Sequence, residues 1–178
     1  AKSKPGQLNY GSAGNGSSNH LVGEMFKTAA GIDLVHIPYR GGGPGMMALV
    51  AGQIDMLVGQ VPTVTPMVNA GRLRAIAVSG AKRSPALPQV PTMAESGLPG
   101  FDATAWYSIV VPAGTPQPII SRLHAELVKI LRSPDIRERL ISEGADVETS
   151  TPEELAAFIR AEIPKWSKAV KESGSKLD

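Results

Sequence analysis

The sequence contains no cysteine, and this absence excludes several kinds of chemistry. Disulfide bonds, zinc–thiolate sites and cysteine nucleophiles all require a thiol. A chain without cysteine is compatible with the reducing cytosol, and equally with a bacterial periplasm in which it forms no disulfide. The chemistry is therefore restricted, while the compartment stays open.

Aromatic residues, charge of one sign and long apolar runs are also scarce. The 178 residues include two tryptophans, three tyrosines and three phenylalanines, and 18 Lys+Arg against 16 Asp+Glu leave a formal net charge of +2. Nucleic-acid binding relies on clustered cations and on aromatic rings that stack on bases, so we expect no nucleic-acid partner. The longest apolar stretches, at residues 73–78 and 108–113, are far shorter than the roughly 20 residues that span a bilayer.

The first residues carry no recognisable leader. The chain opens with Ala1-Lys2-Ser3 instead of methionine, and no signal peptide is visible. We therefore expect that an upstream segment has been removed, by processing or by design.

Glycine and proline divide the first part of the chain into short segments of alternating character. The composition, 42% hydrophobic and 19% charged with 19 glycines and 15 prolines, is that of a globular protein with many turns. The apolar patterns predict strands at residues 7–11, 33–38, 54–58 and 73–78, and helices at residues 21–30, 46–51 and 62–70. Repeated strand–loop–helix units of this length predict an α/β fold with a largely parallel sheet.

Beyond residue 100 the pattern changes to helices. Residues 84–91 are a proline-rich loop, and residues 101–111 form the longest β-like run, which we expect to cross between two lobes. Helices are predicted at residues 116–132, at residues 135–143, and from the capping box at Thr151-Pro152-Glu153-Glu154 towards Ser173 and Gly174, with a kink at Pro164.

These C-terminal helices have apolar faces but little sheet to cover, because only residues 146–148 are a further candidate strand. We therefore expect the chain to divide into two parts. Residues 7–104 would be an α/β ligand-binding lobe. Residues 105–178 would supply a crossover strand and the C-terminal helices of an incomplete second lobe.

A glycine- and serine-rich loop follows the first predicted strand and opens the first helix. Backbone N–H groups at a helix start favour an anion, glycines let a ligand approach the backbone, and hydroxyls supply hydrogen bonds. The spacing is neither that of a P-loop nor that of a dinucleotide-binding fingerprint. The candidate ligand residues here are Ser12, Gly14, Asn15, Gly16, Ser17 and Ser18; the alternative is a glycine-rich turn with a serine cap.

A second glycine-rich loop, Tyr39-Arg40-Gly41-Gly42-Gly43, lies between a predicted strand and a predicted helix. Arg40 could clamp a carboxylate and Gly41 could admit it, although a solvated arginine in a simple turn is an equal alternative. Ligands of parallel sheets bind at the carboxyl ends of the strands, so the two loops together predict a site for a small anion. We add Gln60 and Tyr107 to the candidate ligand residues on the basis of their positions in the chain alone.

Catalytic residues are not evident. His20, His36 and His124 lack metal-ligand spacing, and the serines lack the G-x-S-x-G turn of a nucleophile elbow. Ordinary core or surface roles explain the histidines, and a core role explains Trp106 better than ligand contact does. We expect no enzyme activity, no cofactor and no metal site.

Several segments, taken in order, carry a family resemblance. They are residues 9–17 (NYGSAGNGS), 35–42 (VHIPYRGG), 49–55 (LVAGQID), 73–78 (LRAIAV), 91–97 (PTMAESG), 112–116 (PAGTP) after Trp106, and 151–155 (TPEEL). In this order and spacing they resemble the solute-binding receptors of tripartite tricarboxylate transporters, also called Bug receptors. Each segment alone is a weak signal, but the ordered set covers the chain from about residue 5 to residue 172.

The resemblance implies a periplasmic protein with a type II periplasmic-binding-protein-like fold, in which two α/β lobes close on a small carboxylate, such as a dicarboxylic, tricarboxylic, amino or aromatic acid. The loaded receptor would then dock with a permease of one large and one small membrane subunit. In the family the second-lobe ligand loop matches residues 12–18 here. Family members also carry a further segment before this point, so the resemblance implies a truncated form that lacks the opening part of the first lobe.

Three functions remain open at this point. The first is a carboxylate receptor whose affinity is weakened by the missing part of the clamp. The alternative is an interaction module that forms a homodimer or a domain swap through exposed C-terminal helices, without binding a ligand itself. The third, an enzyme acting on a carboxylate, has no residue that motivates a reaction.

Overall fold

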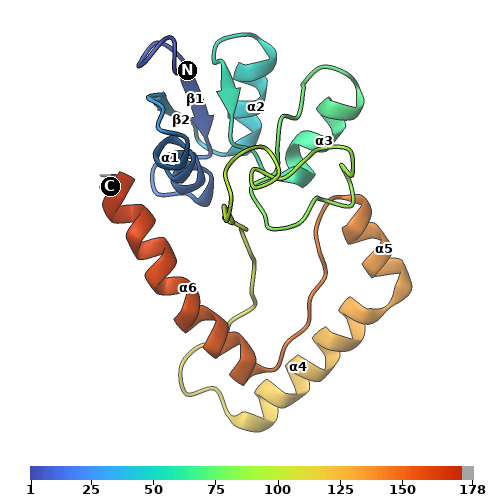
Figure 1. Cartoon of the computed structure of the whole chain (residues 1–178). Coiled ribbons are helices and arrows are strands. Elements are labelled where there is room, and N and C mark those ends of the chain that lie inside the picture. The colour runs from blue at the N-terminus through green and yellow to red at the C-terminus, as the bar shows by residue number, and fades with distance from the viewer. Residues whose placement is uncertain (174–178) are drawn as a thin grey trace.

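The computed structural model describes residues 1–173 and contains a small parallel sheet with helices packed around it (Figure 1). The elements of the first part run in the order β1 (Asn9–Ser12), α1 (Ser18–Ala30), β2 (Val35–Pro38), α2 (Gly42–Val50), β3 (Met56–Leu57) and α3 (Val61–Asn69). The sheet has three strands in the order β2-β1-β3. Both pairs are parallel, with Tyr10 opposite His36 on one side and Met56 on the other. The predicted α/β class with a parallel sheet is confirmed.

Local signals in the sequence account for the bounds of α1. The side chain of Ser17 caps the first turn by accepting a hydrogen bond from the His20 N–H. The helix ends at Gly31, whose φ of 59° is left-handed and whose N–H bonds back to the last turn. Leu21 and Val22 are buried on the helix face that meets the rest of the domain. The predicted helix is therefore confirmed. It begins at Ser18 and not at Leu21, because Ser17 is its cap.

Three expected strands do not form. Residues 73–78 contribute only a single parallel bridge between Val78 and Thr92, and residues 101–111 and 146–148 contain no strand. A strand needs a neighbouring backbone, and apolar side chains do not supply one. Among the described residues, the N–H of Ala103 still reaches the Ser79 carbonyl at 2.8 Å, whereas residues 105–111 make no backbone hydrogen bond to another segment.

The C-terminal part consists of α4 (Gln117–Arg132), α5 (Pro134–Ser142) and α6 (Pro152–Ser173), close to the predicted bounds. The capping box holds the start of α6: the Thr151 N–H donates to Glu154 at 2.8 Å, and the Glu154 N–H donates to the Thr151 hydroxyl at 3.1 Å. The helix runs through Pro164 as one element, and its expected stop at Gly174 lies outside the described residues.

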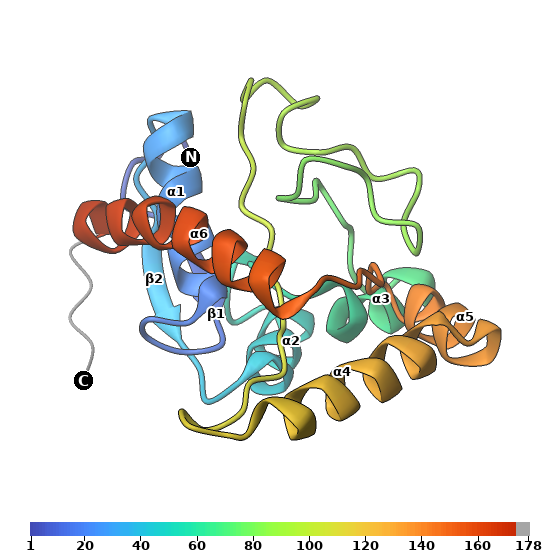
Figure 2. The ribbon, with the colours of Figure 1, turned by 90° about the horizontal axis from the view of Figure 1, so that it is seen from below.

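Helix α6 lies beside α1, as two perpendicular views show (Figures 1 and 2). Residues 101–111, the extended segment, connect the two parts of the chain. The shared core joins Val22 of α1 to Phe101 and Ala103 of this segment, with Trp166 of α6 packed against them. Distant parts of the chain therefore meet at one side of α1. This packing carries residues 105–107 towards the N-terminal end of that helix.

Helix α4 contrasts with α6, because it buries none of its residues. Ile119, Leu123 and Ile130 remain 50%, 45% and 49% exposed.

Within residues 1–173, none of the helices combines the length and the apolar character that crossing a bilayer requires.

Gly23 of α1 provides a test of the packing between this helix and the sheet. A Cβ at Gly23 would collide with the ring of Tyr10, which is completely buried. We expect Gly23→Ala to lower the free energy of unfolding by about 1–3 kcal/mol through overpacking. Urea denaturation followed by circular dichroism measures the change.

Gly43 of α2 is the matched control, because a Cβ there meets nothing within 4 Å. Gly43→Ala should leave stability unchanged or raise it by up to about 1 kcal/mol, since alanine favours helix. Equal stability of Gly23→Ala and the unsubstituted chain would contradict the described packing.

Candidate functional site

The loop between β1 and α1 is held by its own hydroxyl groups. Ser12 is completely buried, and its hydroxyl accepts from the Gly14 N–H at 3.1 Å and contacts the Gly14 carbonyl at 3.2 Å. The Ser17 hydroxyl donates to the same carbonyl at 2.7 Å while it caps α1. Gly14 and Gly16 adopt φ values of 132° and 71°, which a side chain would strain. The serines thus shape a loop whose glycines cannot readily be replaced.

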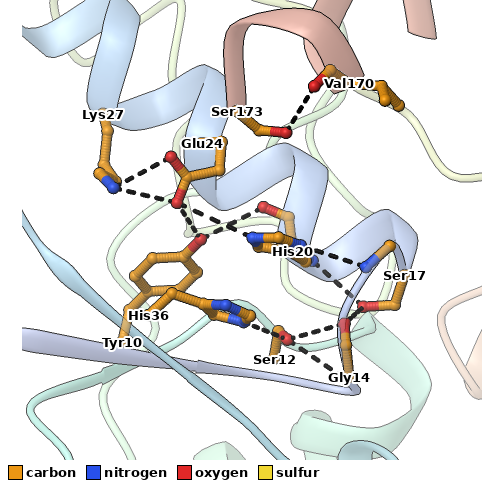
Figure 3. Close-up of polar contacts among 11 residues, drawn as sticks. Tyr10, Ser12, Gly14, Ser17, His20, Glu24, Lys27, His36, Val170 and Ser173 are labelled. Carbon is orange, nitrogen blue, oxygen red and sulfur yellow. Dashed lines mark hydrogen bonds and ion pairs between the residues drawn. The ribbon is translucent and has the colours of Figure 1, made fainter. Parts of the chain in front are cut away.

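Beside this loop lies a largely buried cluster that comes from β1, β2 and α1 (Figure 3). The rings of His20 and His36 stack with centroids 3.8 Å apart. His36 Nε2 lies 2.7 Å from the Ser12 hydroxyl, and the Gly16 N–H donates to His20 Nδ1 at 3.2 Å. Each histidine therefore supports one end of the loop. Because His20 Nδ1 accepts the hydrogen bond from Gly16, the His20 ring is in its neutral form.

The acidic end of this cluster is Glu24. Its carboxylate accepts from the Tyr10 hydroxyl at 2.7 Å and forms an ion pair with Lys27 at 3.0 Å. Burial raises the pKa of the Tyr10 phenol, and the Glu24 carboxylate raises it further. Burial also lowers the pKa of His36 to about 4, assisted by the adjacent His20 and opposed by Glu24. The pKa of His20 is lowered by burial as well, against the pull of Glu24.

The second glycine-rich loop lies next to the first. The Tyr39 N–H donates to the Ser12 carbonyl and the Gly41 N–H donates to the Ala13 carbonyl, both at 3.1 Å. Gly41 has a φ of 106° and precedes α2 directly. The structure thus brings the two loops together at the carboxyl ends of β1 and β2, as the sequence predicts. Arg40 is exposed there and forms no ion pair within residues 1–173.

A cavity of about 220 Å³ opens beside the start of α1. It is lined by Ser18, Gln60, Ala105, Trp106, Tyr107 and Trp166. The Asn19 side chain donates to the Val58 carbonyl at 2.9 Å and so brings the start of α3, where Gln60 is the cap, next to Ser18. The core contacts of Phe101 and Ala103 bring the aromatic residues to the opposite wall.

One carboxylate fixes two of these aromatic residues. Glu162 of α6 accepts from the indole N–H of Trp106 at 3.2 Å and from that of Trp166 at 2.7 Å. Burial opposes ionisation of Glu162, but the hydrogen bonds from the two indoles and the charge of Lys165 outweigh it, so that its pKa is lowered. Glu162 therefore stays a carboxylate at neutral pH and connects the extended segment to α6.

The cavity contains three of the residues that the sequence singles out: Ser18, Gln60 and Tyr107. The other candidates form the two neighbouring loops and do not line it; they are Ser12, Gly14, Asn15, Gly16, Ser17, Arg40 and Gly41.

Sequence reasoning missed Trp166 and Glu162, and it assigned Trp106 to the core. Trp106 is among the residues that carry the family resemblance, whereas the only signal for Trp166 was the rarity of tryptophan. Their juxtaposition arises from the packing of α6 on α1. Among residues 1–173, no group of three or more His, Cys, Asp or Glu side chains is placed to hold a metal ion.

His36 makes stability depend on pH. Its pKa falls from 6.5 to about 4 in the folded chain, so between these values the unfolded chain binds a proton that the folded chain does not. The free energy of unfolding should therefore decrease as pH is lowered from 6.5 to 4, by about 1–2 kcal/mol once solvent screening of the ring is included.

His36→Gln should remove this part of the acid sensitivity, which urea denaturation at pH 7 and pH 4.5 would measure. His124→Gln is the control, because His124 lies apart from the cluster and contacts the Ser150 carbonyl. The same acid sensitivity in both variants would argue against His36 as its source.

Comparison with known proteins identifies the family. A family model described as "Tripartite tricarboxylate transporter family receptor" matches residues 1–175. Protein BugT of Bordetella pertussis is 35% identical over 99% of this chain and 54% of its own length. The chain spans about half the length of BugT and of the "UPF0065 protein in tcbD-tcbE intergenic region" of Pseudomonas sp. (strain P51).

Two solved structures extend the match to the fold. "R. palustris Rpa4515 with adipate" has a TM-score of 0.91 at 34% identity, over 98% of this chain and 58% of that one. "MatC (Rpa3494) from Rhodopseudomonas palustris with bound malate" has a TM-score of 0.79 at 34% identity, over 93% of this chain and 57% of that one. The family consists of transport receptors and not of enzymes, which agrees with the expectation from the residues. This chain belongs to the receptor family of the tripartite tricarboxylate transporters.

Proposed function

We propose that this chain is the carboxylate-binding part of a periplasmic solute receptor that delivers a small acid to a tripartite transporter. The observation that carries the proposal is the cavity between the start of α1 and residues 105–107. It is supported by two similar structures, of which one holds adipate and the other malate. The membrane permease subunits are the expected partners, and the periplasm is the expected location.

The start of α1 is the proposed contact for the ligand carboxylate. Within the described part of the chain, the N–H groups of Ser18 and Asn19 donate to no protein acceptor, and the positive end of the helix dipole lies here. The Ser18 hydroxyl, the Gln60 amide and the Tyr107 phenol supply further donors around the cavity. A carboxylate at this place would gain charge-assisted hydrogen bonds without contacting any acidic residue of the lining.

The neighbouring loops extend the same site. Asn15 and Gly16 of the first loop and Arg40 and Gly41 of the second lie at the carboxyl edge of the sheet, where ligands of parallel sheets bind. We assign residues 7–104 to a ligand-binding lobe and residues 105–178 to a second lobe. The lack of backbone hydrogen bonds between residues 105–111 and other described segments supports a boundary there.

A panel of small carboxylates at millimolar concentration tests this function through thermal unfolding. A ligand at 100 times its dissociation constant adds about 2.7 kcal/mol to stability, which raises the melting temperature by several degrees. Gln60→Ala should reduce the shift, because Gln60 lines the cavity. Gln53→Ala is the matched control, since Gln53 is exposed before β3 and does not line the cavity. No shift with any carboxylate would reject receptor function for this chain.

Self-association is a second candidate function, favoured by the exposed apolar side chains of α4. Ile119, Leu123 and Ile130 are about half exposed, and Ile109 and Val110 are 66% and 74% exposed. A second copy of the chain could cover these side chains. Association of this kind would not depend on the cavity.

Sedimentation over a range of concentrations tests the second candidate. If α4 mediates association, Leu123→Glu should shift the chain towards monomer, while Ser121→Glu adds the same charge at an exposed polar position and should not. A monomer at every concentration would reject the second candidate without affecting the first.

A further inference from the structure

We infer that the cavity beside α1 selects carboxylates with an apolar or ring-bearing body over compact polar acids with several carboxylates or hydroxyls. This inference rests on the proposed receptor function and specifies the class of acid that the same site would take. It arises from the way Glu162 binds the two tryptophans, and from the uncharged lining of the cavity.

The two indole groups cannot serve as hydrogen-bond donors to a ligand while they bind Glu162. Indole has a single donor, its N–H. In Trp106 and in Trp166 that N–H is directed to the same oxygen of Glu162, at 3.2 Å and 2.7 Å. Both tryptophans therefore line the cavity with ring carbons alone.

The carboxylate of Glu162 is itself held in place. Lys165 pairs with it at 3.4 Å and with Asp102 at 3.6 Å, which connects α6 to the extended segment. The ring of Trp106 meets Phe158 edge to face, with centroids 5.2 Å apart. These contacts fix the orientation of the indoles before a ligand arrives. Glu162 is thus a positioning residue that touches the rings and does not line the cavity.

The rest of the lining separates a polar end from an aromatic wall. Ser18 and Gln60 supply the polar groups, whereas Trp106, Tyr107 and Trp166 supply the rings, and none of the lining side chains carries a charge. A carboxylate at the polar end places the body of the ligand against the rings. A second carboxylate or a hydroxyl there would lose its hydration without a partner, and aromatic faces repel anions. An apolar ring instead buries its carbon surface.

Both tryptophans of the chain line this cavity, so intrinsic fluorescence reports its occupancy directly. The experiment titrates the 178-residue chain with cyclohexanecarboxylate and with malate, neither of which absorbs with tryptophan. Isothermal titration calorimetry with benzoate adds an aromatic acid. We expect cyclohexanecarboxylate to bind at least about tenfold more tightly than malate, a ratio that burial of a few ring carbons would give.

Three variants test which residues set this ratio. Tyr107→Ala removes a ring that is 80% exposed and should leave the fold intact. Trp166→Ala removes a ring that also packs on the core, so its folding must be checked by circular dichroism. Glu162→Gln replaces the carboxylate by a weaker, neutral acceptor and removes its ion pair with Lys165, which should loosen the two indole N–H groups and make them available to polar ligands. Each should lower the ratio of the two affinities, and Glu162→Gln should also shift tryptophan emission. Glu126→Gln, in an exposed ion pair with Arg122 on α4, is the matched control.

The possible outcomes separate this inference from the proposed function. A preference for the ring acid that the three cavity variants reduce and the control retains supports the inference. Malate binding as tightly as cyclohexanecarboxylate overturns it and leaves the receptor function standing. A preference that survives Tyr107→Ala and Glu162→Gln also overturns it. Failure of every carboxylate to bind overturns both.

Discussion

The buried ring of Tyr10 is the contact on which the rest of the site depends. It extends from the central strand β1, meets the backbone of α1 at Gly23, and donates its hydroxyl to Glu24 at 2.7 Å. Because the ring is completely buried and fits closely against Gly23, it holds α1 in position against the sheet. The position of the helix determines where its first turn lies in space, and this first turn forms one wall of the cavity. The same ring lies 5.0 Å from that of His36, so the support of the glycine-rich loop also depends on it.

The sequence predicted the elements whose signals are local. Ser17 and Gly31 bound α1, Thr151 and Glu154 begin α6, and Gly144 follows α5 with a φ of 90°. Each of these signals acts within a few residues, so neighbouring chain segments were not needed to detect it. The expected strands at residues 73–78 and 101–111 failed for the opposite reason. Apolar, β-branched residues favour extended backbone, but a strand also needs a partner, and sequence pattern does not name that partner.

The candidate site divides in the same way. The two glycine-rich loops could be predicted because each joins a strand to a helix at the same edge of a parallel sheet. The aromatic wall of the cavity could not be predicted from the sequence. Trp106 and Trp166 are far apart in the chain, and both reach Glu162 only because α6 packs beside α1 (Figure 1). The stack of His20 on His36 is likewise tertiary. Loop chemistry was therefore visible in the sequence, while the shape and polarity of the cavity depend on packing between distant segments.

A nitrogen–proton NMR titration of the labelled chain tests the central claim, that a carboxylate binds in the cavity beside α1. The account predicts that cyclohexanecarboxylate shifts the backbone amides of Ser18 and Asn19, the side-chain amide of Gln60 and the two indole N–H signals. A second surface hollow lies between the first residues of the chain and the C-terminal end of α1, and the amides of Lys27 and Gly31, which line it, should not move. Shifts confined to that hollow, or scattered over the exposed face of α4, would contradict the account.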